Sequence, residues 1–408
     1  MRIDIGYEDA VSSTLGRLAP LRPTTVSIWD ASGLVLAEDA VAAVDSPSAD
    51  TAMKDGYALR TADLAPVVAG QEVRLRLCGT VVAGQQGSLS LEPGCAIKVM
   101  TGAPLPDGAD AVVPAELARE RGEWVTFGCG ASPGRNVLRR GSDVERGRLV
   151  AAAGCLLRPA AAGLLAAAGL SEVLAHPRPK VALVATGDEV VAPGNPLAPG
   201  QLYASNLVTL RSWLARFGFE SRTAHVVPDH PDQLRDVLSG LLAEVDVVLT
   251  SGGAWKSERD FTPAVLAGLD AEIVFQRVRL APGKAVTLGL LDEKAVFCLP
   301  GGPPSNEMAF LQLALPGLLR LSGRSDAPFR TLRARLAGDV EGGHGDPAWT
   351  SFHQALLKDV DGEMQVEPLR NPSRLSCQAE ADALIKIPEG RVAYTRGDEA
   401  EVQVLFDR

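Results

Sequence analysis

Short apolar runs alternate with helical patterns across residues 178–322, and this is the most regular pattern in the chain. Residues 181–185 form an unbroken apolar run of strand length, which is typical of a parallel strand covered by helices on both faces. Leu207, Leu210 and Leu214 then share one face of a predicted helix. This alternation predicts a doubly wound α/β domain. Its strands are expected at residues 181–185, 223–227, 246–250, 273–279 and 295–299.

The rest of the chain is organised differently. Residues 45–139 contain short apolar runs separated by glycine and proline, which predict a small β domain. Residues 327–408 have the same character and predict a second β domain. The α/β domain is assigned to residues 178–326, and residues 1–44 and 140–177 to an extended segment with helical stretches.

The composition favours a globular protein with substantial cores, since 46% of the 408 residues are hydrophobic and 22% are charged. A net charge of −10 and a pI near 5.2 argue against binding to nucleic acid or to an anionic membrane. The N-terminal residues do not resemble a signal peptide. The most apolar stretch, residues 149–170, is interrupted at Arg158 and Pro159, which indicates a packed helix beginning at the proline and no membrane span. We therefore expect a cytoplasmic protein.

The cysteine spacing adds no chemistry of its own. Six cysteines are scattered at positions 78, 95, 129, 155, 298 and 377, without a Cys-x-x-Cys pair. No two histidines have metal-ligand spacing. This pattern predicts neither a zinc site nor a disulfide framework.

Polar loops follow the predicted strands of the α/β domain, where ligands bind in open parallel sheets. Glycine pairs in such loops expose backbone N–H groups, and helix N-termini add positive dipole ends, so both favour anions. One such loop is indistinguishable from an ordinary turn, but three of them beside several acids point to a phosphorylated ligand. The candidate binding residues are Thr186, Gly187, Glu189, Ser251, Gly252, Gly253, Pro300, Gly301 and Ser305.

Three aspartates near these loops are candidate ligands for Mg²⁺. They are Asp188, Asp229 and Asp260. Mg²⁺ is usually held by one or two carboxylates together with phosphate oxygens and waters. A solvated surface acid remains the alternative for each of the three.

A basic segment lies between two of the predicted strands. Period-two alternation places Arg277 and Arg279 on the same side as Ala281. Lys284 lies on a Pro-Gly turn, where an ammonium group can reach a ligand as a point charge. These cations are expected to bind an anion, and a hairpin with solvated charges is the alternative.

Several motifs together resemble the MoeA family of molybdopterin molybdenumtransferases, which includes the E domain of gephyrin. They occur in the order expected of that family and extend over essentially the whole chain. Two of them, in the β domain, place a carboxylate or hydroxyl beside a glycine that permits close approach of a ligand. The motifs are Asp55-Gly56-Tyr57-Ala58, Met100-Thr101-Gly102-Ala103-Pro104, Thr186-Gly187-Asp188-Glu189, Thr250-Ser251-Gly252-Gly253, Pro282-Gly283-Lys284 and Leu299-Pro300-Gly301.

The resemblance implies a homodimer that inserts molybdate into adenylylated molybdopterin and releases AMP with Mg²⁺. It implies a C-terminal β-barrel, a molybdopterin-binding α/β domain and dimerisation through the extended segment. The active site would lie between the α/β domain of one subunit and the β domain of the other, which would supply Thr101. Other proteins of molybdenum cofactor biosynthesis are possible partners. The residues expected to carry catalysis are Asp55, Asp188, Asp260 and Lys284.

This sequence departs from the family pattern in the ligand-binding loops. Residues 254–257 and 345–347 differ from the usual motifs, Ala281 replaces a lysine, and Gly302 replaces an asparagine. Loss of one charge-assisted hydrogen bond weakens oxyanion binding by roughly ten- to hundredfold. We hypothesise that Arg279 and Lys256 rebuild the anion pocket.

Three hypotheses of the function remain open at this stage. The retained acids favour a molybdenum-inserting transferase. The altered loops favour a protein of the same fold that binds molybdopterin, the finished cofactor or another phosphorylated ligand without turnover. A scaffold or assembly partner is the third hypothesis, for which the acids would be dispensable.

Overall fold

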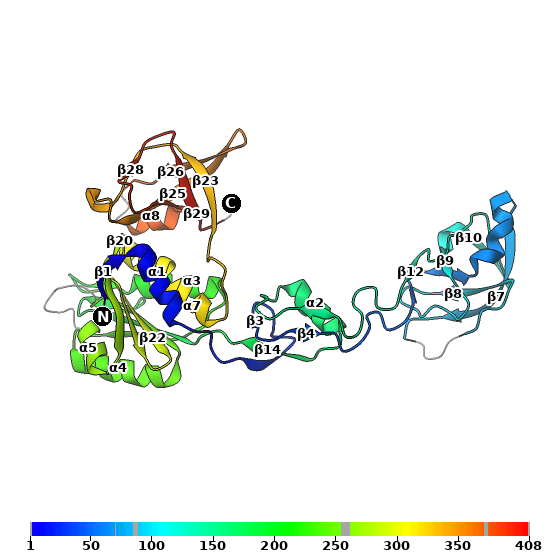
Figure 1. Cartoon of the computed structure of the whole chain (residues 1–408), viewed down its shortest axis with the longest axis horizontal. Coiled ribbons are helices and arrows are strands. Elements are labelled where there is room, and N and C mark those ends of the chain that lie inside the picture. The colour runs from blue at the N-terminus through cyan, green and yellow to red at the C-terminus, as the bar shows by residue number, and fades with distance from the viewer. Residues whose placement is uncertain (1, 70, 85–88, 254–261, 371–373, 407–408) are drawn as a thin grey trace. The chain divides into compact units, whose positions relative to one another are not determined.

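The computed structural model in Figure 1 describes residues 2–69, 71–84, 89–253, 262–370 and 374–406. The chain divides into two compact units. The first contains Met1–Pro23 and His176–Arg408, and the second contains Thr24–Ala175. No helix in the described ranges is long and apolar enough to cross a membrane.

The α/β domain of the first unit is built on a mixed sheet with a parallel centre. The central strands run in the order β18, β15, β19 and β22, all parallel, and β21 and β20 follow as an antiparallel pair. The N-terminal strand β1 pairs in parallel with β20. The strands are β1 (Arg2–Gly6), β15 (Val181–Thr186), β18 (Ser221–Val227), β19 (Val247–Ser251), β20 (Glu272–Ala281), β21 (Thr287–Leu291) and β22 (Lys294–Leu299).

Helices cover both faces of this sheet, so the predicted doubly wound α/β domain is confirmed (Figure 1). All six residues of β15 are buried. Leu183 packs into a core that contains residues of α1, α3 and α7, whereas Val184 packs on the other side with α4 and α5. The antiparallel β21 was not expected from the apolar pattern. The helices are α1 (Tyr7–Arg17), α3 (Ser205–Arg216), α4 (Pro231–Glu244), α5 (Thr262–Gly268), α6 (Pro303–Ala309) and α7 (Leu315–Leu321).

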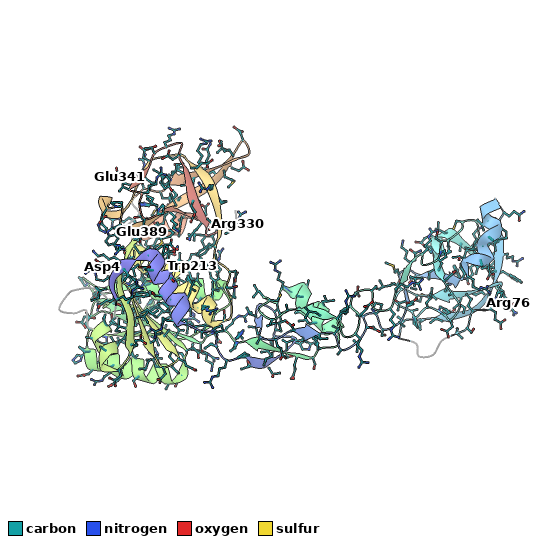
Figure 2. All side chains as sticks on the ribbon, in the orientation of Figure 1. Asp4, Arg76, Trp213, Arg330, Glu341 and Glu389 are labelled. Atoms are coloured by element: carbon teal, nitrogen blue, oxygen red, sulfur yellow. A yellow bond between two sulfur atoms is a disulfide. The ribbon has the colours of Figure 1, made fainter. Side chains whose placement is uncertain are left out.

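The C-terminal region forms a closed β-barrel, as the resemblance implied. Strand β25 pairs with β26 and β27, and the circle closes through β23 and β29. Val366, Ile385 and Val402 are fully buried inside it. Figure 2 labels Glu389, whose carboxylate accepts a hydrogen bond from the backbone of Tyr7 and so ties the barrel to the N-terminal segment. The elements are β23 (Arg330–Leu336), β24 (Val340–Glu341), β25 (Thr350–Val360), β26 (Glu363–Pro368), α8 (Leu375–Glu380), β27 (Ala383–Ile387), β28 (Ala393–Tyr394) and β29 (Glu399–Val404).

We predict that the stability of this barrel falls in acid because of His353. Burial lowers the pKa of His353 from 6.5 to about 4, and its Nε2 has no hydrogen-bond partner among the described residues. The unfolded chain therefore binds this proton near pH 6.5, and the folded chain only near pH 4. The contribution of neutral His353 to the free energy of unfolding is therefore complete above about pH 6.5. It is lost as the pH falls toward 4, and the total loss is roughly 3 kcal/mol.

Urea unfolding at several pH values, compared between the parent and His353→Gln, measures this contribution. The parent should lose stability more steeply between pH 6.5 and 4 than the variant does. Parallel losses in the two proteins would show that other groups cause the acid sensitivity.

The second unit contains a six-stranded sheet, which confirms the β character predicted for this region. Its strands lie in the order β10, β11, β7, β8, β6 and β9, with apolar cores on both faces. A Cβ on Gly56 would lie 2.2 Å from the carbonyl oxygen of Val113, so the neighbouring strand, and not a ligand, requires this glycine. The strands are β6 (Gly56–Leu59), β7 (Val73–Val81), β8 (Cys95–Val99), β9 (Ala111–Pro114), β10 (Ala118–Arg121) and β11 (Trp124–Phe127).

The sequence predicted no disulfide framework, and the structure has one disulfide, between Cys78 and Cys95, whose Cα atoms lie 5.8 Å apart. Strand pairing explains the bond. Arg76 pairs with Cys95 across β7 and β8, and the register shifts between Leu77 and Thr80, which brings Cys78 beside Cys95. Spacing along the chain does not reveal such a register.

The remaining part of the second unit is a small assembly of short elements. Strands β2, β14 and β3 form a three-stranded sheet, β4 pairs with β13, and β5 pairs with β12. Helix α2 begins at Pro159, as predicted, and packs through the buried Leu165. The elements are β2 (Thr24–Ser27), β3 (Val35–Leu36), β4 (Ala40–Val41), β5 (Thr51–Ala52), β12 (Val137–Leu138), β13 (Leu149–Ala151), α2 (Pro159–Ala167) and β14 (Glu172–His176).

Candidate functional site

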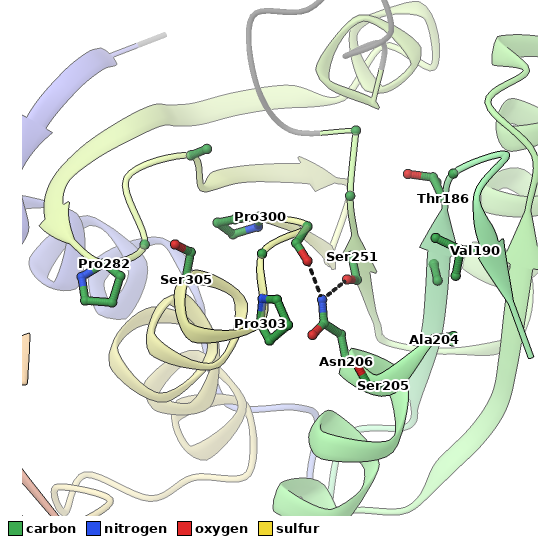
Figure 3. A pocket seen from close by; sticks show the side chains of 18 of the residues that line it. Thr186, Val190, Ala204, Ser205, Asn206, Ser251, Pro282, Pro300, Pro303 and Ser305 are labelled. Carbon is green, nitrogen blue, oxygen red and sulfur yellow. Dashed lines mark hydrogen bonds between the residues drawn. The ribbon is translucent and has the colours of Figure 1, made fainter. Parts of the chain in front are cut away.

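A cavity of about 1190 Å³ lies at the carboxyl ends of the parallel strands of the α/β domain (Figure 3). This is the position where open α/β sheets bind ligands. The loops after β15, β18, β19 and β22 contribute to its wall, together with the turn after β20. The predicted residues that line it are Thr186, Gly187, Glu189, Asp229, Ser251, Gly252, Gly253, Lys284, Pro300, Gly301 and Ser305.

Two consecutive glycines let the loop after β19 pass directly over the end of β15. Gly252 and Gly253 have φ values of +97° and +63°, in the left-handed region that side chains disfavour. A Cβ on Gly252 would lie 2.6 Å from the carbonyl oxygen of Thr186. The hydroxyl of Thr186 is buried beneath this loop and has no hydrogen-bond partner among the described residues.

A buried asparagine joins two of the glycine loops. The Nδ2 of Asn206, in the first turn of α3, donates to the Oγ of Ser251 at 2.9 Å and to the carbonyl oxygen of Gly301 at 2.7 Å (Figure 3). From α6, Asn306 donates to the carbonyl oxygen of Pro300 at 2.8 Å. Neither asparagine was predicted from the sequence. A polar amide in a helix directly after a strand-end loop is the signal that could have found them.

Two of the three residues proposed as metal ligands are joined by a hydrogen bond. The backbone N–H of Asp229 donates to Oδ1 of Asp188 at 3.1 Å, which links the loops after β18 and β15. Asp229 and Glu189 also line the cavity. Asp260 lies outside the described residues. Within the described part of the chain, no group of three His, Cys, Asp or Glu side chains gathers to hold a metal.

Lys284 brings a positive charge to the cavity, as the Pro-Gly turn predicted. Its Nζ lies 5.0 Å from the ring centroid of Trp349, an arrangement in which the ring face attracts the cation. His344, from the C-terminal barrel, lines the cavity and packs 4.6 Å from the same ring. Residues 345–347 were expected from the family resemblance to belong to a ligand-binding loop, but His344 was not predicted as a residue of the site.

Arg277 and Arg279 do not line the cavity, contrary to the sequence-based expectation. The guanidinium of Arg279 donates to the carbonyl oxygens of Asp4 at 2.6 Å and of Ala348 at 3.0 Å. Nη2 of Arg277 lies 3.4 Å from Oδ1 of Asp4. The reason is that β1 pairs along β20, so both arginines face the N-terminal segment. The proposed rebuilding of the anion pocket by Arg279 therefore loses its basis, and Lys256 lies outside the described residues.

Asp55 and Thr101 belong to the second unit and form a pair of their own. Oδ1 of Asp55 accepts hydrogen bonds from the backbone N–H of Thr101 at 2.7 Å and from its hydroxyl at 2.8 Å. These bonds, the backbone one first, lower the pKa of Asp55. The carboxylate therefore stays ionised, and its role in catalysis remains a prediction.

Together, the open α/β sheet, the cavity at its strand ends, the β domain and the closed barrel define a multidomain α/β ligand-binding protein. Comparison with family descriptions makes the class specific. Residues 5–169 match the MoeA N-terminal region (domain I and II), residues 182–320 a probable molybdopterin binding domain, and residues 333–405 the MoeA C-terminal region (domain IV). The chain belongs to the MoeA family of molybdopterin molybdenumtransferases, which confirms the resemblance seen in the sequence.

Individual relatives support this assignment along most of the chain. Molybdopterin molybdenumtransferase 2 of Mycobacterium tuberculosis is 33% identical over 93% of this chain and 95% of its own length. The molybdopterin molybdenumtransferase of Haemophilus influenzae is 34% identical over 75% of this chain and 74% of its own. A solved structure of a molybdopterin biosynthesis MoeA protein from Pyrococcus horikoshii has a TM-score of 0.79 at 31% identity, covering 99% of this chain and 100% of that one.

Proposed function

We propose that this chain is an enzyme of molybdenum cofactor biosynthesis that inserts molybdate into adenylylated molybdopterin and releases AMP. The observation that carries the proposal is the convergence of three glycine-bearing loops, Glu189, Asp229 and Lys284 on one cavity of about 1190 Å³. A cavity of this size accommodates a ligand with several phosphate groups. The relatives are named molybdopterin molybdenumtransferases, which supports the transfer of molybdenum to molybdopterin.

The loops would hold the phosphate groups through their backbone. Gly253 and Gly301 place peptide N–H groups at the cavity without side chains in front of them, which favours anions. The N–H of Gly252 donates to the carbonyl oxygen of Leu299 and holds the loop against β22. Asn206 holds two of these loops together, so their donors point into one space. The ammonium of Lys284 would neutralise negative charge at the other side of the cavity.

The residues present fit Mg²⁺. Asp188 and Asp229 offer two carboxylates on adjoining loops, and Mg²⁺ commonly takes that number with phosphate oxygens and waters completing its shell. When bound, the metal would neutralise charge that develops at the phosphoanhydride. The chain's own part is to hold the phosphates and to keep the two carboxylates beside them. We also propose a cytoplasmic homodimer, which rests on the family resemblance.

Purified protein supplied with adenylylated molybdopterin, Mg²⁺ and molybdate tests the proposal by AMP release and by formation of active cofactor. Molybdate-dependent AMP release is the expected result. The second candidate, a binding protein without turnover, is favoured by Ala281 and Gly302, which line the cavity at positions where the family resemblance implies a lysine and an asparagine. Tight binding without AMP release would establish that candidate, and neither binding nor release would overturn both.

We predict that Lys284→Met weakens binding of the phosphorylated ligand by roughly ten- to hundredfold, because one charge-assisted hydrogen bond is lost. Isothermal titration calorimetry with molybdopterin or its adenylylated form measures the change. Lys180→Met is the matched control, because Lys180 precedes β15 at the opposite end of the sheet. Equal affinities for the two variants would contradict a role for Lys284.

A further inference from the structure

A basic and aromatic face on the β domain is not used by the proposed reaction. It is formed by three neighbouring strands, β10, β11 and β7, in antiparallel pairing. Opposite residues in antiparallel strands project from the same face. The registers therefore align six residues in two rows, which are Arg119, Thr126 and Arg74 in one and Arg121, Trp124 and Arg76 in the other.

This face is turned to solvent. Along β7, Arg74 and Arg76 are exposed while Leu75, between them, is buried in the apolar core. Trp124 is 39% exposed, and Val125, the next residue, is fully buried. The alternation places the four arginines and the indole on the outer surface (Figure 2 labels Arg76).

The partners of these arginines within the chain hold them only weakly. The guanidinium of Arg74 lies 4.5 Å from the ring centroid of Trp124. Arg76 lies 3.7 Å from Glu123, and Arg119 pairs with Glu72, with every side chain of both pairs more than half exposed. Exposed pairs of this kind contribute little to stability. Carboxylates of a ligand can therefore replace those of the two glutamates. With four arginines and two glutamates the face is positive, although the chain has a net charge of −10.

The same face ends at a free sheet edge. Strand β10 is the first strand of its sheet, and among the described strands it pairs only with β11. Its outer side carries backbone N–H and C=O groups with which another extended chain can pair. Arg119 and Arg121 lie two positions apart on this strand, so their side chains project from the same face of the sheet, beside the position of an added strand.

We propose that the outer edge of β10 and its arginine face bind an extended acidic segment of another protein, which adds a strand to this sheet. Acidic side chains two positions apart in that segment would lie opposite Arg119 and Arg121. Nucleic acid also fits the charge, but a strand edge offers hydrogen bonds in the pattern of a polypeptide backbone, so the edge favours the peptide. The alternative is that these arginines only prevent edge-to-edge aggregation of the sheet, and in that case the face would have no affinity for such a segment.

Fluorescence anisotropy with a labelled peptide of alternating glutamate and threonine tests this with the full chain. We expect saturable binding that Arg119→Glu with Arg121→Glu weakens by about tenfold or more. Arg222→Glu with Arg235→Glu makes the same charge change on exposed arginines of the α/β domain and should leave binding as in the parent. Circular dichroism and thermal melting establish that both double variants are folded.

Two further probes separate strand addition from charge alone. The same peptide methylated on alternate backbone nitrogens cannot pair with β10 and should bind at least about tenfold more weakly. A single-stranded oligodeoxynucleotide should bind more weakly than the peptide. Equal binding of the methylated peptide, tighter binding of the oligonucleotide, no binding of the peptide, or no effect of the Arg119 and Arg121 changes would each overturn the proposal.

Discussion

Gly252→Ala is expected to abolish ligand binding and to lower the free energy of unfolding by about 2–4 kcal/mol. The φ value of +97° is unfavourable for alanine, and the new Cβ would lie 2.6 Å from the carbonyl oxygen of Thr186 and 2.9 Å from its hydroxyl. The oxygen belongs to the backbone of β15, which is buried on both faces and cannot move aside. The loop after β19 must therefore lift and carry its N–H groups away from the cavity.

Gly302→Ala is the matched control for this prediction. Gly302 lines the same cavity, its φ is −68°, and a Cβ there would meet nothing within 4 Å. We expect its stability to stay within about 0.5 kcal/mol of the parent. Calorimetric titration with molybdopterin measures the ligand affinity of the two variants, and urea unfolding measures their stability. If Gly252→Ala bound ligand as well as Gly302→Ala does, the tight passage over β15 would not be needed for the site.

The residues that gather at the cavity could be predicted largely from one rule, which is that parallel strands end at a common edge. Thr186, Ser251 and Pro300 follow buried apolar runs, and the structure brings all three to one cavity. These apolar runs could be recognised as buried strands because a strand that is covered on both faces shows no alternation of polar and apolar residues. The closed barrel, in contrast, came from the family resemblance, since short runs alone do not show which strands pair.

What could not be predicted depends on contacts between distant segments. Arg277 and Arg279 alternate as expected, but β1, more than 250 residues earlier, covers their side. In β1, Asp4 accepts a hydrogen bond from Arg279 through its carbonyl oxygen and forms an ion pair with Arg277 through its carboxylate. His344 reaches the cavity only because the barrel packs beside β20. The bond between Cys78 and Cys95 depends on a shifted strand register. No local pattern of residue types contains this information.

Asp188→Asn is expected to reduce AMP release by about a hundredfold or more while leaving the fold intact. The carboxylate oxygen of Asp188 accepts the backbone N–H of Asp229, and the amide oxygen of asparagine can accept the same bond. The substitution therefore removes charge without removing this contact. If Asp188 helps to hold Mg²⁺, the variant should also need a higher Mg²⁺ concentration for half-maximal rate.

Asp236→Asn is the control, because Asp236 is 78% exposed on α4 and its removal changes the net charge of the chain by the same amount. Its AMP release and Mg²⁺ dependence should match the parent. Three outcomes for Asp188→Asn have different meanings. A lower rate that added Mg²⁺ restores indicates a metal ligand, and a lower rate that Mg²⁺ does not restore indicates a role toward the phosphates. A parental rate at every Mg²⁺ concentration would remove Asp188 from the site and leave Asp229, which lines the cavity, as the described candidate carboxylate.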